Sequence, residues 1–489
     1  MQRGHDAVRR FRVLAILSML NMPRQRSVRI TCVLAMSLTL ACSGCGIVAR
    51  TVIDGYEKLN AGALTNPGRI GPLTDTERIW ARTAWRYVAN NTNASTGLVN
   101  SADGYPATTM WQIGDYLAAL VAARELKLIE RNEFDRRLSD VLHFLGQMPL
   151  LPGGLPNRVY NTQTGAMSND ANQPGTIGTS AVDVGRVLVW LHAIGARYPE
   201  YGEYVDRAVL RWNLCELVGG DGTLYATRID ARQTVRVAEI RPGYDAYAGT
   251  GFRLWGVRAS DADAAPLAQA YANGVRIYFD ARDPRQSGVT NALVSAPWLL
   301  SGIEFGWRGT QRADASGRPD GAAQADAVYR AQEARWRKDG ILTARTDHQV
   351  DQPPYFVYDS VFANGYAWNT VGDDGRAYPQ LALVATRAAF GMWVLWDTAY
   401  TTRLMRGVDA LYDADRGWFE GRYEATGAHD RTLALSTNAT VLEALLYKSS
   451  GRLVPAVRAD GYFSARMKDV FAHPATCLPI AASVEPGPQ

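Results

Sequence analysis

The chain contains few cysteines and histidines, and this scarcity limits its chemistry. Of the five cysteines in 489 residues, three precede residue 46, and the other two are Cys215 and Cys477. An exported chain can oxidise such a pair, but nothing in the sequence brings the two together, so we expect two separate buried thiols. The six histidines are scattered, and no Cys/His spacing of a zinc site occurs. The sequence therefore predicts no metal site.

Signatures of several large enzyme classes are also missing. No Gly-x-Ser-x-Gly elbow, P-loop or dinucleotide-binding glycine motif occurs. Strands and helices do not alternate in the βαβ rhythm that a nucleotide-sugar transferase with a parallel sheet requires. These absences argue against all of these classes, and we expect no cofactor.

The net charge of the chain after residue 45 is close to zero, whereas aromatic residues are abundant. Residues 1–45 hold seven Arg and one Asp, which leaves 45 basic and 47 acidic residues for the rest. A nearly neutral body without a basic stripe argues against nucleic acid as a partner. The 13 Trp and 23 Tyr residues either fill a core or stack on sugar rings.

Residues 1–45 have the composition of an export signal. A cationic stretch at 22–29 precedes an apolar stretch at 30–41, which is too short to span a membrane. Residues 1–21 fit an upstream extension from a misassigned start codon. We therefore expect an exported, periplasmic protein.

Two cysteines at the end of this signal are candidate lipidation sites. Cys42 and Cys45 both follow small residues, as the modified cysteine of a bacterial lipobox does. The alternative is cleavage nearby without a lipid. Because Ser43 is not an inner-membrane retention signal, we expect a lipid anchor in the inner leaflet of the outer membrane.

The rest of the chain is predicted to form one domain. Residues 46–72 read as a linker, 73–470 as the domain and 471–489 as a C-terminal tail. The domain contains about twelve apolar runs of helical period, one of them at 264–278, and no long β-alternating stretch.

This pattern predicts an all-α fold. Six α-hairpins that close into an (α/α)6 toroid require about twelve helices, the number that the apolar runs supply. Short β-hairpins are expected in the loops at 222–229 and 418–424, where aromatic and polar residues alternate beside Gly.

Three of the expected helices begin alike. Each start carries Ser, Thr or Asn where an N-cap residue belongs, followed by an acidic residue in an otherwise apolar helix. This recurrence suggests hairpins whose polar ends face one shared cleft. The starts lie at 108–115, 178–185 and 436–443, and we expect Thr109, Thr179 and Asn438 within two residues of a helix start.

Several strings between residues 73 and 450 together resemble a bacterial exported family known as domain of unknown function 3131. That family is similar to six-hairpin glycoside hydrolases of the endo-β-1,2-glucanase type, so the resemblance implies an (α/α)6 toroid associated with an exported or periplasmic glucan. The chain departs from the family pattern at Gln112, Gly114, Asp115 and Asp245. The strings are Tyr105-Pro-Ala-Thr-Thr-Met-Trp111, Leu155-Pro-Asn-Arg-Val-Tyr160, Thr179-Ser-Ala-Val-Asp-Val-Gly-Arg186, Pro242-Gly-Tyr-Asp-Ala-Tyr247, Ile303-Glu-Phe-Gly-Trp307, Pro354-Tyr-Phe-Val-Tyr358, Gly417-Trp-Phe-Glu-Gly421 and Ser436-Thr-Asn-Ala439.

Hydrolysis of a glycosidic bond needs one protonated carboxyl group and one carboxylate. Glu304 is the candidate acid, because aromatic neighbours and flanking glycines suit a partly apolar pocket in which a carboxyl group stays protonated. The alternative is a helix-end glutamate bonded to an arginine. We expect Glu304 to line the deepest pocket, close to Trp307 and Tyr358.

Three acidic residues are candidates for the second carboxylate, and each has a structural alternative. Asp183 is spaced for an ion pair with Arg186. Asp245 stands at a helix start, where it could serve as a cap. Glu420 lies on an expected hairpin that could project into the cleft. Asp115 is a weaker candidate.

Seven aromatic residues are candidate sugar platforms, because they fall in loops or at helix ends rather than within apolar helix faces. The alternative for each is a place in the core. They are Trp111, Tyr160, Tyr244, Trp307, Tyr358, Trp368 and Trp418.

These features favour a periplasmic glycoside hydrolase or transglycosylase that acts on a β-glucan or exopolysaccharide with two carboxylates. One alternative is a glycan-binding or scaffold lipoprotein of an envelope polysaccharide system, with no working acid pair. Another is a polysaccharide lyase, which needs a Tyr or His base and an Arg or Asn cluster that neutralises a uronate.

Overall fold

The computed structural model describes residues 68–456, apart from 231–232, 261–264, 288 and 308–318. All of these residues belong to one compact unit, Asn66–Gln489. The leader, both lipidation candidates, Cys477 and the C-terminal tail lie outside the described residues. Cys215 is disulfide-bonded, so the expectation of a free buried thiol at that position is wrong.

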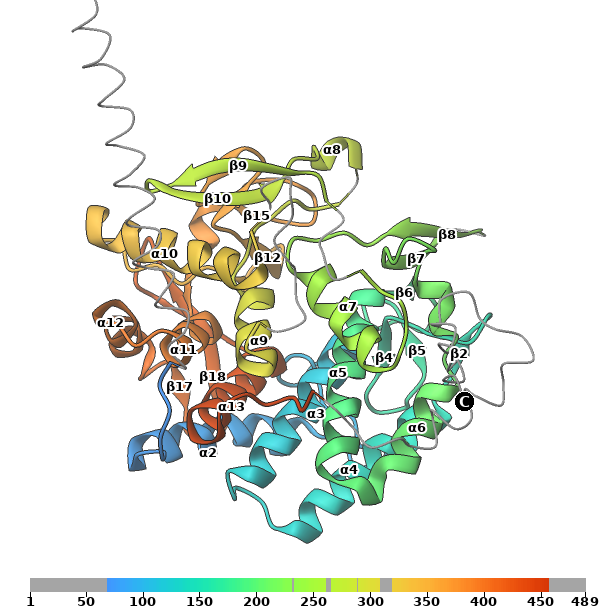
Figure 1. Cartoon of the computed structure of the whole chain (residues 1–489). Coiled ribbons are helices and arrows are strands. Elements are labelled where there is room, and N and C mark those ends of the chain that lie inside the picture. Colours follow the sequence, from blue (N-terminus) through green and yellow to red (C-terminus); the bar gives the residue numbers. More distant parts are fainter. Residues whose placement is uncertain (1–67, 231–232, 261–264, 288, 308–318, 457–489) are drawn as a thin grey trace, which may run out of the picture. The chain divides into compact units, whose positions relative to one another are not determined.

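Six helices form a closed inner ring (Figure 1). Each packs against the next in the order α3, α5, α7, α9, α11 and α13, and α13 packs back on α3. The helices are apolar on nearly every side, and most of their residues are buried, as expected of helices enclosed by protein. They are α3 (Met110–Glu125), α5 (Ala181–Arg197), α7 (Tyr244–Leu254), α9 (Ala296–Phe305), α11 (Thr386–Leu395) and α13 (Leu435–Ser450).

The remaining helices of the described residues flank this ring and mostly turn one face to solvent. α2 begins with a capping box, in which Thr74 and Glu77 bond reciprocally. α8 is a single turn, and three short 3-10 helices join other elements. The flanking helices are α2 (Asp75–Asn91), α4 (Arg131–Gln147), α6 (Gly202–Leu210), α8 (Pro284–Ser287), α10 (Gly321–Asp339) and α12 (Ala399–Val408), and the 3-10 helices are η2 (Pro199–Tyr201), η3 (Leu214–Leu217) and η4 (Pro379–Leu381).

The expected helix at 264–278 is wrong. This segment forms a β-hairpin of β9 (Leu267–Ala272) and β10 (Val275–Asp280), paired in register from end to end. Its turn is Asn273-Gly274, and both residues have positive φ. Asn-Gly between two short alternating runs is a strong hairpin signal, which outweighs the apolar content of the flanking residues.

Strands are more numerous than the sequence suggested, and they form small antiparallel sheets. Strands occur at both expected hairpin positions. The sheets consist of β1 (Ala107–Thr109), β4 (Val159–Asn161) and β5 (Met167–Ser168); β2 (Leu150–Leu151) and β3 (Leu155–Pro156); β6 (Gly178–Thr179), β7 (Tyr225–Asp230) and β8 (Gln233–Ala238); β9 and β10; β11 (Asp347–Gln349), β12 (Phe356–Asp359) and β15 (Thr370–Val371); β13 (Phe362–Ala363) and β14 (Tyr366–Ala367); and β16 (Leu383–Ala385), β17 (Tyr412–Asp413), β18 (Gly417–Tyr423) and β19 (His429–Leu433).

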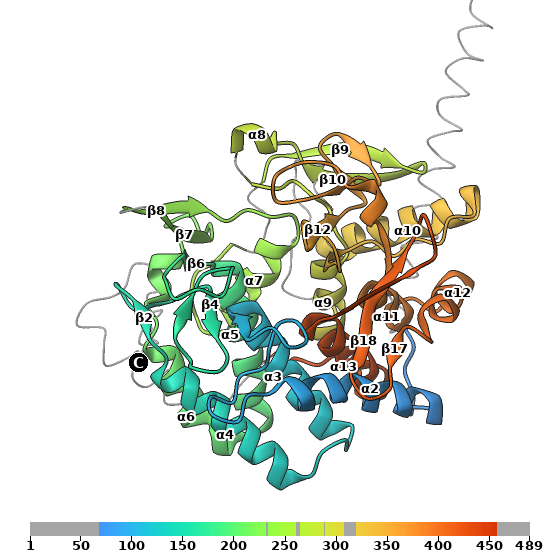
Figure 2. The same cartoon turned by 180° about the vertical axis from the view of Figure 1, so that it is seen from behind.

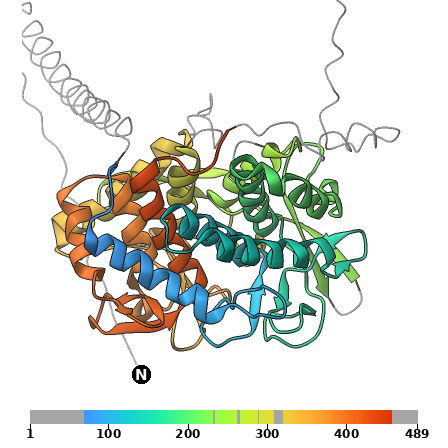
Figure 3. The ribbon, with the colours of Figure 1, turned by 90° about the horizontal axis from the view of Figure 1, so that it is seen from below.

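The strands stand at the N-terminal ends of the inner helices. A strand precedes five of the six within a few residues, namely β1, β6, β8, β16 and β19 before α3, α5, α7, α11 and α13. From behind, β18 is seen beside α2 and α13, which it contacts (Figure 2). The view from below shows mainly helices (Figure 3). The chain thus places its loops and sheets around the end of the ring where the inner helices begin.

Two of the three expected helix starts are confirmed. Thr109 is the N-cap of α3 and forms a capping box with Gln112, and Thr179 lies two residues before α5. Asn438 is instead in the fourth position of α13. Its side chain accepts a hydrogen bond from the Trp418 N–H at 2.8 Å and donates to the Trp418 carbonyl at 3.2 Å, so it fastens β18 to the helix.

Close packing of the inner helices can be tested at Gly251 in α7. A Cβ atom there would collide with the Gly185 carbonyl of α5. We expect Gly251→Ala to lower the free energy of unfolding by about 1–3 kcal/mol, because the two helices must separate. Gly146 in α4 is the matched control: nothing lies within 4 Å of its added Cβ, so Gly146→Ala should stabilise by up to about 1 kcal/mol. Urea denaturation measures both, and equal effects would contradict this packing.

Candidate functional site

A buried arginine occupies the centre of the inner ring. The guanidinium of Arg186 in α5 forms ion pairs with Asp115 of α3 at 3.0 Å, with Glu443 of α13 at 2.6 Å and with Glu304 of α9. It also donates to the Tyr247 hydroxyl of α7 at 2.5 Å. Arg186, Glu304 and Glu443 have no exposed surface. One cation therefore links five of the six inner helices.

This arrangement overturns the expected position of Glu304. Its carboxylate accepts hydrogen bonds from Arg186, from the Tyr247 hydroxyl at 2.7 Å and from the Trp190 indole at 3.1 Å. It has no exposed surface, and a fully enclosed carboxylate cannot reach a glycosidic oxygen in this conformation. The alternative of a glutamate bonded to an arginine is the arrangement found. The expected pair between Arg186 and Asp183 is also wrong, because Arg186 points to the ring centre.

Three carboxyl groups share this single arginine, which favours protonation of one of them. Burial raises the pKa of Glu443 well above its usual range, and the neighbouring charges of Glu304 and Asp115 raise it further, although Arg186 opposes both effects. The Oε2 atom of Glu443 has no hydrogen-bond partner among the described residues. We therefore expect Glu443 to be the member of this cluster that most readily holds a proton.

A cleft of about 1010 Å³ lies near the beginnings of α5 and α7. One part of its lining comes from β6, β7 and β8 and from the segment 239–241 that leads to α7. Other parts come from Phe279, from 281–285 and 289–291, from Tyr358 of β12 and from the turns at 364–366 and 371–375. β6, β7 and β8, at the beginnings of α5 and α7, thus form one wall of this cleft.

Glu239 lines the cleft, and its carboxylate accepts hydrogen bonds from three donors. The Ser180 hydroxyl donates to it at 2.7 Å, the Val182 backbone N–H at 3.2 Å and Arg241 at 2.9 Å. The first two donors belong to the start of α5, where the helix dipole also favours negative charge. Glu239 was not expected from the sequence. The only signal was a charged pair, Glu239 and Arg241, directly before the Pro-Gly turn that starts α7.

Asp183 lies in the first turn of the same helix and has a contrasting environment. Its side chain is nearly buried, with 8% exposure. Burial raises the pKa of Asp183 to about 6, and the negative charge of Glu239 adds to this, while Arg241 and Arg158 oppose it. A carboxyl group that keeps its proton to a higher pH than usual is suited to act as a proton donor.

A second group of polar residues lies where α7, α11 and α13 begin. Asp347 accepts hydrogen bonds from the Tyr244 hydroxyl and from Arg387, each at 2.8 Å. Glu420 of β18 accepts from the Thr437 hydroxyl at 2.8 Å, and burial raises the pKa of Glu420 to about 8. Glu420 is therefore a buried acid in β18 and does not line the described cleft.

The two remaining acidic candidates also lie outside the cleft lining. Asp115 accepts hydrogen bonds from Arg186 and, at 2.6 Å, from the Ser436 hydroxyl. Asp245 is buried in the first turn of α7. The expectation that it caps this helix is wrong, because the N-cap residue is Gly243.

The aromatic candidates divide between the cleft and the core. Tyr358 lines the cleft, and Trp111 is half-buried against Tyr244, with ring centroids 5.4 Å apart. Tyr160 and Trp418 are fully buried, so their proposed role as sugar platforms is wrong.

The other two aromatic candidates are half-buried and packed against protein. Trp307 contacts Trp396 and donates to the Trp298 carbonyl at 3.0 Å. Trp368 lies under the Arg335 guanidinium, 4.7 Å away.

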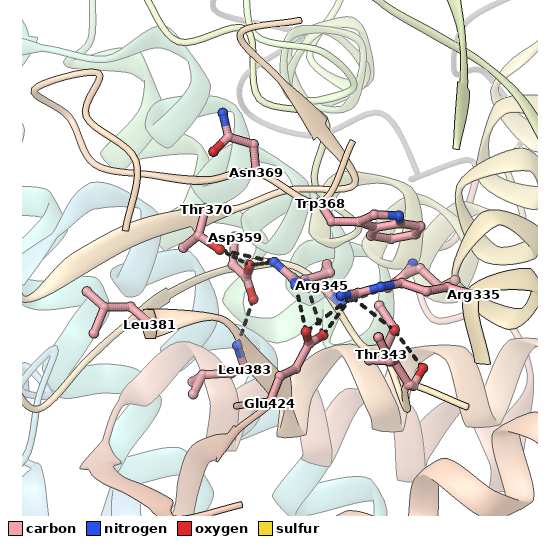
Figure 4. Close-up of polar contacts among 12 residues, drawn as sticks. Arg335, Thr343, Arg345, Asp359, Trp368, Asn369, Thr370, Leu381, Leu383 and Glu424 are labelled. Carbon is pink, nitrogen blue, oxygen red and sulfur yellow. Dashed lines mark hydrogen bonds and ion pairs between the residues drawn. The ribbon is translucent and has the colours of Figure 1, made fainter. Parts of the chain in front are cut away.

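A second buried arginine positions the wall that carries Tyr358 (Figure 4). Arg345 binds Glu424 through two hydrogen bonds of 3.0 and 2.7 Å and pairs with Asp359, the residue after Tyr358. Asp359 also accepts from the Thr370 hydroxyl at 2.7 Å and from the Leu383 N–H at 2.9 Å. The two carboxylates fasten β12 to β15, β16 and β18, which orients one side of the cleft.

Residues 79–451 match the family described as "Protein of unknown function (DUF3131)". The chain belongs to the DUF3131 family. The resemblance noted in the sequence is thereby confirmed. No curated protein sequence matches this DUF3131 protein.

Solved structures with a similar fold are carbohydrate-related proteins of low sequence identity. A candidate glucoamylase from Bacteroides caccae is 13% identical, with a TM-score of 0.58 over 82% of this chain and 96% of that chain. An endo-β-1,2-glucanase from Chitinophaga pinensis, in complex with sophorotriose and glucose, is 12% identical, with a TM-score of 0.56 over 78% and 94%. A β-1,2-glucanase from Parabacteroides distasonis is 11% identical, with a TM-score of 0.51 over 83% and 59%. At these identities the likeness establishes the fold.

Among the described residues, no group of three or more His, Cys, Asp or Glu side chains could hold a metal ion. None of the helices described for this DUF3131 protein is long and apolar enough to cross a membrane.

The central ion-pair cluster can be tested with two substitutions. Arg186→Met should lower the free energy of unfolding by about 3–5 kcal/mol, because it leaves buried carboxylates without their cation. Glu443→Gln should have a much smaller effect, because glutamine resembles the protonated acid in size and polarity. Urea denaturation of both variants measures the difference. If Glu443→Gln destabilised as much as Arg186→Met, Glu443 would be ionised and needed as a charge.

Proposed function

We propose that this DUF3131 protein is an (α/α)6 toroid that cleaves or transfers glycosidic bonds of a β-glucan or related exopolysaccharide. The observation that carries the proposal is the cleft that Glu239 lines, with the buried acid Asp183 in the first turn of α5, where its N–H donates to the lining residue Ser180 at 3.0 Å. Asp183 supplies the proton to the leaving oxygen, and Glu239 acts as the ionised carboxylate of a two-carboxylate mechanism. The similar fold of glucanase structures supports the choice of substrate class by analogy.

The surroundings of each group suit its role. Asp183 is desolvated, so it keeps its proton up to a pH of about 6. Glu239 lines the cleft with 12% of its side chain exposed, so it can contact a ligand there. Tyr358 offers an aromatic surface in the same cleft.

One observation favours the alternative of a glycan-binding protein without hydrolysis. Glu239 already accepts hydrogen bonds from Ser180, Val182 and Arg241. A carboxylate that satisfies three donors is a weaker base towards water. Binding to the cleft does not need this base, so the activity assay separates the two functions.

Purified full-length protein incubated with a panel of β-glucans should release reducing ends. Asp183→Asn removes the proton but keeps the size, so the rate should fall by about 10²–10⁴-fold while glycan binding survives. Asp409→Asn, at the exposed end of α12, is the matched control and should retain full activity. Glycan binding without release of ends would support the binding protein, and an unsaturated product would identify a lyase.

The pH dependence gives an independent test. The donor must be protonated, so kcat should fall as pH rises through about 6, by about tenfold for each further pH unit. This limb reports the pKa of Asp183 and should disappear in Asp183→Asn. If the variant keeps both its rate and this limb, another residue is the acid.

We further propose that the protein is exported to the periplasm and lipidated at Cys42 or Cys45. The support is the sequence of residues 1–45, with its cationic and apolar stretches. Cells fed labelled palmitate should yield labelled protein, and substitution of the modified cysteine by serine should abolish the label. A labelled double variant would contradict the assignment.

A further inference from the structure

The arginines that line the proposed cleft outnumber the lining carboxylates that pair with them. Arg241 and Arg285 each pair with a carboxylate that also lines the cleft, Glu239 and Asp283 respectively. Three further lining arginines do not.

These three arginines differ in whether another carboxylate of the protein pairs with them. Arg158 pairs at 2.5 Å with Asp170, but both side chains are largely exposed, and such pairs contribute little. Arg282 pairs with Asp280, which is fully buried behind the lining. Arg228, on β7, is exposed and has no ion-pair partner among the described residues.

The lining also contains two acids in the turn at 371–375, and among the described residues neither forms an ion pair with a lining arginine. Asp374 accepts from the Tyr378 hydroxyl at 2.8 Å and pairs with Arg376. Asp373 interacts with Tyr358. Arg228 therefore stays available for an anion from outside the protein.

An exposed tyrosine is presented at the same cleft. Tyr366 begins β14 and is 71% exposed. Its hairpin turns at Asn364 and Gly365, which both have positive φ, as a two-residue type I′ turn requires.

This hairpin is anchored, so the exposure of Tyr366 is a fixed feature. The Asn364 N–H donates to the Asn291 side chain at 3.0 Å, and Phe362 packs on Phe279 with ring centroids 4.4 Å apart. A largely exposed ring, held at a cleft by an anchored turn, is suited to stacking on a sugar.

We propose that the cleft binds an acidic glycan, with a sugar ring stacked on Tyr366 and a uronate carboxylate bound by Arg228. This inference rests on the cleft of the proposed function and specifies its substrate class. The planar guanidinium can bind a carboxylate through two parallel hydrogen bonds. A neutral glucan would stack on the tyrosine but leave Arg228 unused.

The test compares sugars that differ only in charge. The probes are β-1,2-, β-1,3- and β-1,4-linked gluco-oligosaccharides and the same chains oxidised at C6 to glucuronate. Isothermal titration calorimetry on the full chain should show the oxidised form of at least one linkage binding about tenfold tighter than its neutral form. The preference should weaken as salt is raised. Equal binding of both forms, or no binding of any oxidised chain, would overturn the inference.

Variants assign the effect to the two residues. Arg228→Gln should abolish the preference for the oxidised chain, and Arg228→Lys should retain part of it. Arg403→Gln, an exposed arginine of α12 outside the cleft lining, should leave it intact. Tyr366→Ala should weaken binding of oxidised and neutral chains alike. An unchanged preference in Arg228→Gln would refute the role of this arginine.

The outcomes separate this inference from the proposed function. If a neutral glucan is cleaved in an Asp183-dependent manner and Arg228→Gln has no effect on binding, the hydrolase stands and the acidic substrate fails. If the oxidised chain binds through Arg228 but is never cleaved, the acidic ligand stands and hydrolysis fails.

Discussion

The fold depends on the buried guanidinium of Arg186. Six apolar helices can pack side by side in several registers, because hydrophobic contacts have little directional preference. A planar cation with fixed donor directions admits few arrangements of its partners. The carboxylates of Asp115, Glu304 and Glu443 come from three different helices. Any slippage of these helices would leave a buried charge unpaired, at a cost of several kcal/mol.

At the end of the ring where they begin, the same helices present polar backbone groups. Their first backbone N–H groups have no partners within the helix and carry partial positive charge. The carboxylate of Glu239 accepts a hydrogen bond from one of these groups, the Val182 N–H. β6, β7 and β8 supply one wall of the cleft, and Arg345 fastens the wall that carries Tyr358. The buried cation thus specifies helix register, and the helix ends provide the polar site.

Local signals in the sequence were reliable where the chemistry is local. The caps at Thr74 and Thr109 depend on residues three positions apart, and both formed. The helix expected at 264–278 failed because the Asn273-Gly274 turn was overlooked, although it too is a local signal. Asn438 shows the opposite case, because its side chain serves β18, twenty residues away, rather than its own helix start.

The sequence by itself determined the helical periodicity, the family and the presence of acidic and aromatic residues near helix starts. The tertiary structure decided which of them face solvent. Glu304 has the aromatic neighbours expected of a catalytic acid, yet the ring closes around it and supplies Arg186 from 118 residues away. Glu239 has no distinctive motif and reaches the cleft because β8 leads it past the start of α5. Whether a side chain is buried, and which charge it pairs with, depends on residues distant in the sequence. Only the folded chain therefore defines both.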